Sequence, residues 1–217
     1  MDAHDEQYRT KQGLRWWPEN ELARFIGKTY GATCGKKTAF SRGLAMDLGC
    51  GTGRNSWLLY ESGFDVHAID TSGDAVTLAR RFLEDRVGLN GIMVSRASVQ
   101  EYFVGVSPAT YDLVVDIQTT QHLSWLEKAD AFQEIADALK PGGRFFSMHW
   151  CGLPQHAQAI YGGAYPELDL VTVQEMQEVL AESGFQAPMI AAPYIVQRGY
   201  PELSAWASWM IVEAVKA

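Results

Sequence analysis

The chain has 217 residues, 47% of them apolar and 20% charged, which suits one domain with a substantial core. Its formal net charge of −8 disfavours a nucleic-acid partner, because the phosphates would be repelled. The three cysteines lack the spacing of a metal site or a disulfide framework, and no apolar run reaches the length of a membrane span. We therefore expect a cytoplasmic protein that binds no metal, no membrane and no nucleic acid.

Residues 1–43 precede the first predicted strand. Within them, Glu19–Tyr30 carries apolar side chains at helical spacing, and Pro18 stands ahead of this helix as a start signal. Trp16 and Trp17 are adjacent in an otherwise polar stretch. One interpretation is that these tryptophans fasten the N-terminal segment to the body of the domain, and the other is that the segment covers a ligand site.

A glycine-rich turn follows the apolar run Leu44–Leu48, which predicts a buried strand. Gly49, Gly51 and Gly53 occupy alternate positions, and a helix with an apolar face begins near Arg54. Glycine permits positive φ and close approach of the backbone to a ligand, and the helix directs its free N–H groups at the turn. The stretch therefore predicts a strand–turn–helix site for a ligand with an anionic end.

An acidic residue ends the second predicted strand, Phe64–Ile69. Asp70 follows the glycine-rich turn by about twenty residues, the interval at which a βαβ unit returns a carboxylate to ribose hydroxyls. The alternative is that Asp70 caps the next helix, but Ser72 can supply that cap. We therefore predict that Asp70 binds a ribose.

Strands and amphipathic helices continue to alternate along the chain, which predicts an α/β domain. Ligands of such sheets bind at the carboxyl ends of parallel strands, so we expect residues 117–123, which follow one predicted strand, to enter the site. After Asp70 the predicted helices are Gly73–Arg86, Leu126–Leu139 and one that begins with a capping box at Thr172. One predicted strand begins at Ile92, and the others are Tyr111–Asp116, Phe145–Trp150, Phe185–Val196 and Ala205–Val215.

The run Asp47-Leu48-Gly49-Cys50-Gly51-Thr52-Gly53 resembles motif I of the class I S-adenosylmethionine (SAM)-dependent methyltransferases, written D/E-x-G-x-G-x-G. Tyr111–Asp116 resembles motif IV of that family, and Leu139–Gly143 matches its L-K-P-G-G word. The resemblance implies a Rossmann-like three-layer sandwich with a seven-stranded, mostly parallel sheet whose last strand is antiparallel. It also implies one domain overall, with residues 1–43 as an N-terminal helical lid segment and residues 44–217 as the methyltransferase domain.

The resemblance implies SAM as the cofactor. The glycines and Asp47 would lie at its methionine portion, Asp70 would hold the ribose, and Ser98 and Val99 would flank the adenine. The family commonly has Asp where this chain has Ser98, although a Ser hydroxyl can also accept a hydrogen bond from the adenine amino group. The predicted cofactor-binding residues are Asp47, Gly49, Gly51, Gly53, Asn55, Asp70, Thr71, Ser98, Val99, Asp116 and Ile117.

The resemblance also implies methyl transfer to a small-molecule acceptor, with S-adenosylhomocysteine (SAH) as the product. O-methylation is our first expectation and N-methylation the second. A hydroxyl acceptor benefits from a general base, and histidine suits that role near neutral pH. His149 ends the fifth strand and His122 follows the fourth, and we favour His149 as the base. The predicted acceptor-binding residues lie in the N-terminal lid and in the loop after the fifth strand: Tyr8, Trp16, Trp17, His156 and Tyr161.

Two other functions stay open on the sequence. An NAD-dependent oxidoreductase would share the strand–turn–helix site, but its fingerprint has a third glycine where this chain has Arg54. A non-catalytic protein that binds SAM or another nucleoside would share every cofactor residue, because methyl transfer requires no particular side chain. The acceptor is not indicated, and the chain is compatible with a monomer or a homodimer.

Overall fold

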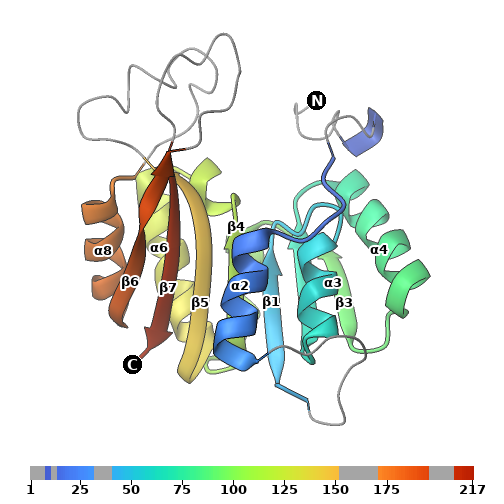
Figure 1. The fold of residues 1–217 in the computed structure, drawn as a ribbon, viewed down its shortest axis with the longest axis horizontal. Coiled ribbons are helices and arrows are strands. Elements are labelled where there is room, and N and C mark those ends of the chain that lie inside the picture. The colour runs from blue at the N-terminus through green and yellow to red at the C-terminus, as the bar shows by residue number, and fades with distance from the viewer. Residues whose placement is uncertain (1–7, 11–13, 32–40, 152–170, 196–207) are drawn as a thin grey trace.

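The computed structural model describes residues 8–10, 14–31, 41–151, 171–195 and 208–217, and Figure 1 shows their arrangement. Seven strands form one sheet: β1 (Leu44–Leu48), β2 (Asp65–Asp70), β3 (Ile92–Arg96), β4 (Tyr111–Ile117), β5 (Leu139–Cys151), β6 (Phe185–Ile195) and β7 (Ser208–Lys216). Their order is β3-β2-β1-β4-β5-β7-β6, and β7 is antiparallel to both of its neighbours while the pairs from β3 to β5 are parallel. The predicted sheet, with its antiparallel last strand, is confirmed.

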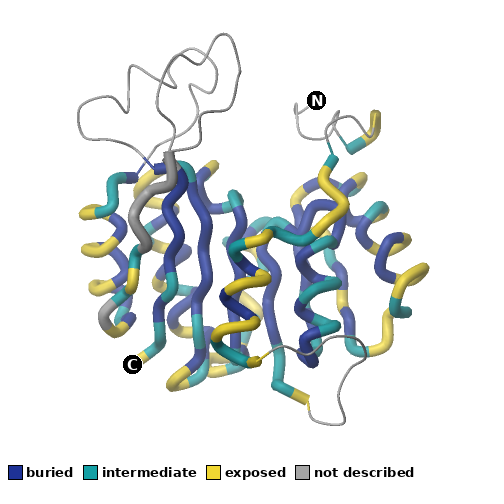
Figure 2. Tube along the Cα trace, in the orientation of Figure 1, coloured by how far each residue is buried: buried dark blue, intermediate teal, exposed yellow. Residues whose placement is uncertain are grey.

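Helices cover both faces of the sheet. They are α2 (Asn20–Tyr30), α3 (Arg54–Glu61), α4 (Gly73–Val87), α5 (Val99–Phe103), α6 (Trp125–Ala138) and α8 (Val173–Glu182), and a short 3-10 turn, η1, spans Thr120–His122. One apolar cluster joins the sheet to α2, α3 and α4, and a second joins its other face to α5, α6 and α8. Figure 2 shows the strands buried between helices whose outer sides are exposed. The predicted three-layer sandwich is therefore confirmed.

Local signals place the starts of the helices. The Ser72 side chain accepts a hydrogen bond from the Ala75 N–H at the start of α4, as the sequence predicts. The predicted capping box at the start of α8 is also present, between Thr172 and Glu175. These caps satisfy N–H groups that the first helical turn leaves without a partner.

The fifth strand is longer than the sequence predicts. We expected a helix to reach Leu139 and a strand to begin at Phe145, but α6 ends at Ala138 and β5 begins at Leu139. Leu139 already pairs with Tyr111 of β4, and the register shifts before Leu113. The turn residues of the L-K-P-G-G word lie inside this irregularity, where Gly142 has a φ of 76°. Strand pairing resumes at Arg144 opposite Leu113, and Leu139 is buried in the core.

The carboxyl ends of β1, β2, β4 and β5 meet at one edge of the sheet, which faces the top of Figure 1. The glycine-rich turn after β1 and the η1 turn after β4 both lie there, because parallel strands bring their following loops to the same edge. Among the described helices, none is both long and apolar enough to cross a membrane.

Candidate active site

The glycine-rich turn between β1 and α3 requires glycine at three positions. Gly49, Gly51 and Gly53 have φ values of 62°, 54° and 80°, in the left-handed region that other residues rarely adopt. A Cβ at Gly49 would lie 2.1 Å from Thr119 Oγ1, and one at Gly53 would lie 3.2 Å from Ala79. The turn therefore packs between α4 and the segment after β4. Its middle glycine, Gly51, lies at the edge of the sheet.

Asp70 closes this turn from the end of β2. Its Oδ2 accepts a hydrogen bond from the Gly51 N–H at 2.9 Å, and its Oδ1 accepts one from the Ser72 N–H, also at 2.9 Å. Each carboxylate oxygen can accept more than one hydrogen bond. The neighbouring Thr71 is exposed, and its carbonyl accepts from Arg96 Nε. The carboxylate therefore lies beside the middle glycine, as a ribose-binding residue would.

Asp47 and Asn55 flank the turn but have inward contacts. Asp47 is buried in β1 and its carboxylate accepts a hydrogen bond from the Ser56 hydroxyl, which ties α3 to the strand. Burial raises the pKa of Asp47 to about 7. The side-chain oxygen of Asn55 accepts from the Glu19 N–H at 2.9 Å. The predicted role of Asp47 at the methionine portion and the predicted cofactor contact of Asn55 remain predictions.

Residues 14–20, which we call the N-terminal strap, cross over the glycine-rich turn and the start of α3. The Thr52 hydroxyl donates to the Arg15 carbonyl at 2.7 Å. The Arg54 guanidinium donates to the Trp17 carbonyl at 2.8 Å and pairs with Glu19 at 3.6 Å. The strap is therefore fastened to the same turn that forms the candidate cofactor site.

The side chains of Trp16 and Trp17 pack against helices α4 and α3. The Trp16 ring packs on Phe82 of α4 with centroids 5.7 Å apart, and the Trp17 ring packs on Trp57 of α3 at 6.4 Å. Trp17 remains 73% exposed. These contacts favour the interpretation that the tryptophans fasten the strap, and they give no support to the predicted contact with an acceptor.

Tyr8 lies at the glycine-rich turn. A Cβ at Gly51 would be 2.9 Å from its hydroxyl oxygen. Burial, followed by the nearby Asp70 carboxylate and Cys50, raises the pKa of Tyr8 well above its usual value. Tyr8 therefore lies beside Gly51 and Asp70, two of the predicted cofactor residues. The acceptor-binding role predicted for it remains a prediction. The other two predicted acceptor residues, His156 and Tyr161, lie outside the described residues.

Ser98 caps α5 with a capping box. Its hydroxyl donates to Glu101 Oε2 at 2.9 Å and accepts from the Glu101 N–H at 3.2 Å. Val99, which follows it, is buried in the core. The predicted contact of Ser98 with an adenine remains a prediction, and any such bond would use a hydroxyl that the helix cap already engages.

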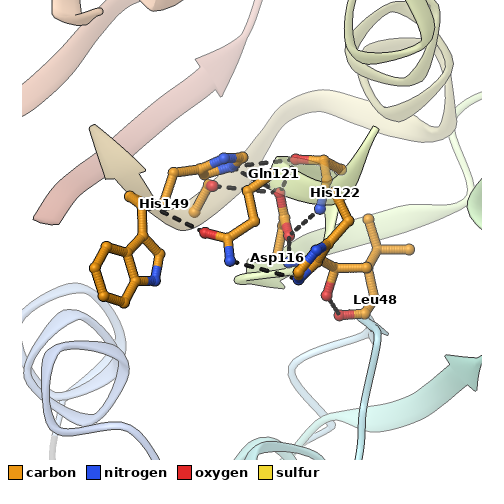
Figure 3. Close-up of polar contacts among 9 residues, drawn as sticks. Leu48, Asp116, Gln121, His122 and His149 are labelled. Atoms are coloured by element: carbon orange, nitrogen blue, oxygen red, sulfur yellow. Dashed lines mark hydrogen bonds and ion pairs between the residues drawn. The ribbon is translucent and has the colours of Figure 1, made fainter. Parts of the chain in front are cut away.

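Asp116, at the end of β4, is the centre of a buried polar network. Its Oδ1 accepts hydrogen bonds from the N–H groups of Thr119 at 3.1 Å and Thr120 at 3.2 Å. Its Oδ2 accepts from the Thr120 hydroxyl at 2.5 Å, lies 2.9 Å from His149 Nε2 and makes a long contact of 3.4 Å with the Ser147 hydroxyl. Figure 3 shows these groups converging on the carboxylate. The predicted cofactor contact of Asp116 and of the neighbouring Ile117 remains a prediction, but the Asp116 side chain turns toward β5.

The two candidate bases have different surroundings. The His149 side chain is 2% exposed, and its ring lies 6.2 Å from the ring of Phe132 in α6. His122 is exposed on η1, and its Nε2 lies 3.5 Å from Gln121 Nε2. Figure 3 shows the Gln121 amide between the His122 imidazole and the end of β5, where Gln121 Oε1 accepts from the Trp150 N–H at 3.1 Å. Of these two histidines, His122 is the one whose side chain reaches the surface.

The sequence predicted that residues 117–123 enter the site but assigned no role to Gln118 or Thr119. Gln118 has a φ of 64°, a rare conformation for a residue that is not glycine and one that is frequent at functional sites. Thr119 donates from its hydroxyl to the Leu48 carbonyl at 2.8 Å, so it joins β4 to the glycine-rich turn. The only signal in the sequence is that this polar run directly follows a buried strand.

Comparison with known proteins agrees with this geometry. A family model described as a methyltransferase domain matches residues 45–143. An uncharacterized methyltransferase of Mycobacterium tuberculosis is 32% identical over 99 residues, which are 46% of this chain and 36% of that protein. Residues 45–143 of this chain are therefore similar to a methyltransferase domain.

Other similar proteins cover more of the chain. A ubiquinone biosynthesis O-methyltransferase of Burkholderia multivorans is 29% identical over 171 residues, which are 76% of this chain and 70% of that protein. The structure of a putative sarcosine dimethylglycine methyltransferase from Galdieria sulphuraria superposes with a TM-score of 0.73 at 14% identity, over 100% of this chain and 99% of the other. The chain spans little more than a third of the length of the mycobacterial relative.

Proposed function

We propose that this protein transfers the methyl group of SAM to a hydroxyl of a small molecule and releases SAH. The single observation that carries the proposal is the glycine-rich turn with Asp70 bonded to its middle glycine, inside the segment that matches the methyltransferase domain. O-methylation is favoured because an O-methyltransferase is among the relatives that span most of this chain. The two functions left open on the sequence become outcomes of the tests below.

The residues of the site fit this cofactor. Gly51 brings no side chain of its own to the turn, where the Tyr8 hydroxyl lies nearby, and its N–H donates to the Asp70 carboxylate. When bound, the cofactor supplies a methyl group made electrophilic by a cationic sulfur. In our proposal the glycine turn holds its methionine portion, Asp70 accepts from its ribose hydroxyls, and Tyr8 lies against the same portion from the strap side.

We propose His122, not His149, as the general base. A base must reach the acceptor proton within hydrogen-bond distance, and the His122 imidazole is exposed at the edge of the sheet whereas His149 is buried and bonded to Asp116. In the tautomer that leaves Nε2 unprotonated, His122 would accept the weak contact of 3.5 Å from the Gln121 amide, and an acceptor hydroxyl would replace that amide before giving up its proton. This choice reverses the preference that the sequence alone suggested.

Calorimetric titration with SAH tests the cofactor. We expect wild-type protein to bind SAH and Asp70→Ala to bind it at least about tenfold more weakly, since the ribose would lose its carboxylate. NAD(H) serves as the competing ligand. Tight binding of NAD(H) with no heat from SAH would contradict the proposal and favour the oxidoreductase.

Methyl release from labelled SAM, measured with separate pools of phenols, aliphatic alcohols and amines, tests the reaction. We expect a hydroxyl pool to react, and His122→Ala to lower kcat by about 10²–10⁴-fold, as loss of a general base does. His122→Gln is the matched variant that keeps polarity without basicity. Transfer to amines alone would replace O- by N-methylation, and SAH binding with no transfer to any pool would favour the non-catalytic protein.

A further inference from the structure

We propose that the buried pair of Asp116 and His149 is a positioning device that fixes residues 119–122 against the glycine-rich turn. The inference rests on the proposed function, because the segment it fixes carries the proposed base, His122. Neither residue would touch the cofactor or the acceptor through its side chain. Both would act through the segment between them, which we call the η1 segment (residues 119–122).

The Asp116 carboxylate defines the start of the η1 segment. Its Oδ1 accepts from the N–H groups of Thr119 and Thr120, two consecutive backbone donors directly after Gln118, whose backbone is left-handed. A left-handed residue that is not glycine persists only where its surroundings hold it. The two hydrogen bonds to a carboxylate supply such a constraint, because charge-assisted bonds are stronger than those between neutral groups.

His149 holds the other oxygen of that carboxylate from the neighbouring strand. An ionised carboxylate only accepts, so the short contact of 2.9 Å requires a proton on His149 Nε2. Burial alone would raise the pKa of Asp116, but the charge and hydrogen bond of His149 and the hydrogen bonds of Thr120 hold that pKa below its usual value. With Nε2 committed as a donor and the ring 2% exposed, His149 orients the carboxylate.

The η1 segment in turn contacts the candidate cofactor site. The Thr119 hydroxyl donates to the Leu48 carbonyl at 2.8 Å, and the same side chain fills the space that a Cβ at Gly49 would need. At its other end, Gln121 binds the Trp150 backbone, one residue after His149. A continuous set of contacts thus runs from β5 through Asp116 to the glycine-rich turn. Loosening it at His149 should loosen both His122 and the cofactor turn.

Two substitutions at His149 separate positioning from other roles. In His149→Leu the donor to Asp116 is lost, whereas His149→Gln places an amide N–H near the former Nε2 but cannot act as a base. We expect amide hydrogen exchange of residues 119–122 to accelerate at least about tenfold in His149→Leu, with exchange in β1 and β3 unchanged. We expect the Kd for SAH to rise about tenfold in the same variant. His149→Gln should recover most of both losses.

A second pair of variants keeps the test decisive if His149→Leu does not fold. Thr120→Val removes the hydroxyl that donates to Asp116 Oδ2, while Thr120→Ser retains it. The backbone N–H to Oδ1 remains in both variants. We expect faster exchange confined to residues 119–122 in Thr120→Val, and wild-type exchange in Thr120→Ser.

The outcomes distinguish this inference from the proposed function. The exchange measurement uses the ligand-free protein, so it remains informative even if wild-type protein binds no SAH, a result that would count against the proposed function alone. Unchanged exchange of residues 119–122 in both His149→Leu and Thr120→Val would overturn the positioning role. Loss of activity in His149→Gln with a wild-type exchange pattern and SAH affinity would also overturn it, and would assign His149 as the base.

Discussion

Gly49 illustrates what the site requires of a single residue. Its φ of 62° disfavours any side chain, and the space beside it is filled by Thr119, whose Oγ1 would lie 2.1 Å from an added Cβ. Two independent constraints thus select glycine here. The sequence indicates the first constraint through the glycine spacing, but the second comes from a residue seventy positions away and is visible only in the folded chain.

Gly49→Ala should therefore be costly. We expect a loss of unfolding free energy of about 1–3 kcal/mol, from strained backbone and displacement of Thr119, together with weaker SAH binding. Urea denaturation and calorimetry measure the two effects. Gly27→Ala is the matched control, because Gly27 lies in the α2 helix with open space around it and should gain up to about 1 kcal/mol. Equal effects of the two substitutions would contradict this explanation.

Asp47 should make stability depend on pH in an identifiable direction. Burial raises its pKa in the folded state to about 7, from an ordinary value of 3.8, so the folded protein holds a proton that the unfolded chain releases. The stabilisation that the protonated Asp47 carboxyl adds to the unfolding free energy is fully present below pH about 4. It is lost as the pH rises to about 7, which lowers the unfolding free energy by an amount on the order of a few kcal/mol.

The neutral variant Asp47→Asn isolates this effect. From pH 4 to pH 7 the wild-type protein should lose unfolding free energy relative to Asp47→Asn. Asn keeps an acceptor for the Ser56 hydroxyl but does not ionise. Denaturant titrations at several pH values measure this difference. A difference that is constant over the range would show that Asp47 titrates normally.

At the scale of elements, the N-terminal strap and the start of α3 form one unit. The Arg54 guanidinium connects them through the Trp17 carbonyl and the Glu19 carboxylate, and its side chain is only 13% exposed. The sequence places Arg54 where a dinucleotide fingerprint has glycine, but the partners of this arginine lie in a segment with no recognised motif.

Arg54→Ala should release the strap. We expect a loss of roughly 1.5–3 kcal/mol for hydrogen bonds that involve a charged group, and faster cleavage of residues 14–20 in limited proteolysis. Arg24→Ala is the control: Arg24 also pairs with a glutamate, but on the exposed side of α2, where an ion pair contributes little. If both variants resist protease as the wild-type protein does, the strap is held by its tryptophans instead.

At the scale of the whole molecule, the antiparallel strand β7 completes the sheet. It is inserted between β5 and β6 and pairs with both, so the sheet would have two unpaired edges and a divided core without it. Met210 and Val212 of this strand are fully buried. The C-terminal residues are therefore part of the core, although they lie outside the segment that matches the methyltransferase domain.

Truncation before Ser208 should abolish cooperative folding. We expect no single unfolding transition by circular dichroism and loss of SAH binding, because strand pairing on both sides of β7 is removed. Val212→Asp should have a similar but smaller effect, since it places a charge at a fully buried position. A truncated chain with a wild-type thermal transition would show that β7 is dispensable.

Local sequence patterns predicted an α/β domain, most of its strands and the glycine-rich turn, whereas the seven-stranded sheet was implied by the family resemblance. Apolar runs, glycine spacing and caps are local signals, and each acts over a few neighbouring residues of the chain. The tertiary structure decided which polar groups meet. Asp116 of β4 contacts His149 of β5, Thr119 contacts Leu48 of β1, and the Trp16 ring packs on Phe82 of α4. Such partners follow from strand order and burial, which bring distant residues within hydrogen-bond distance and leave no trace in local spacing.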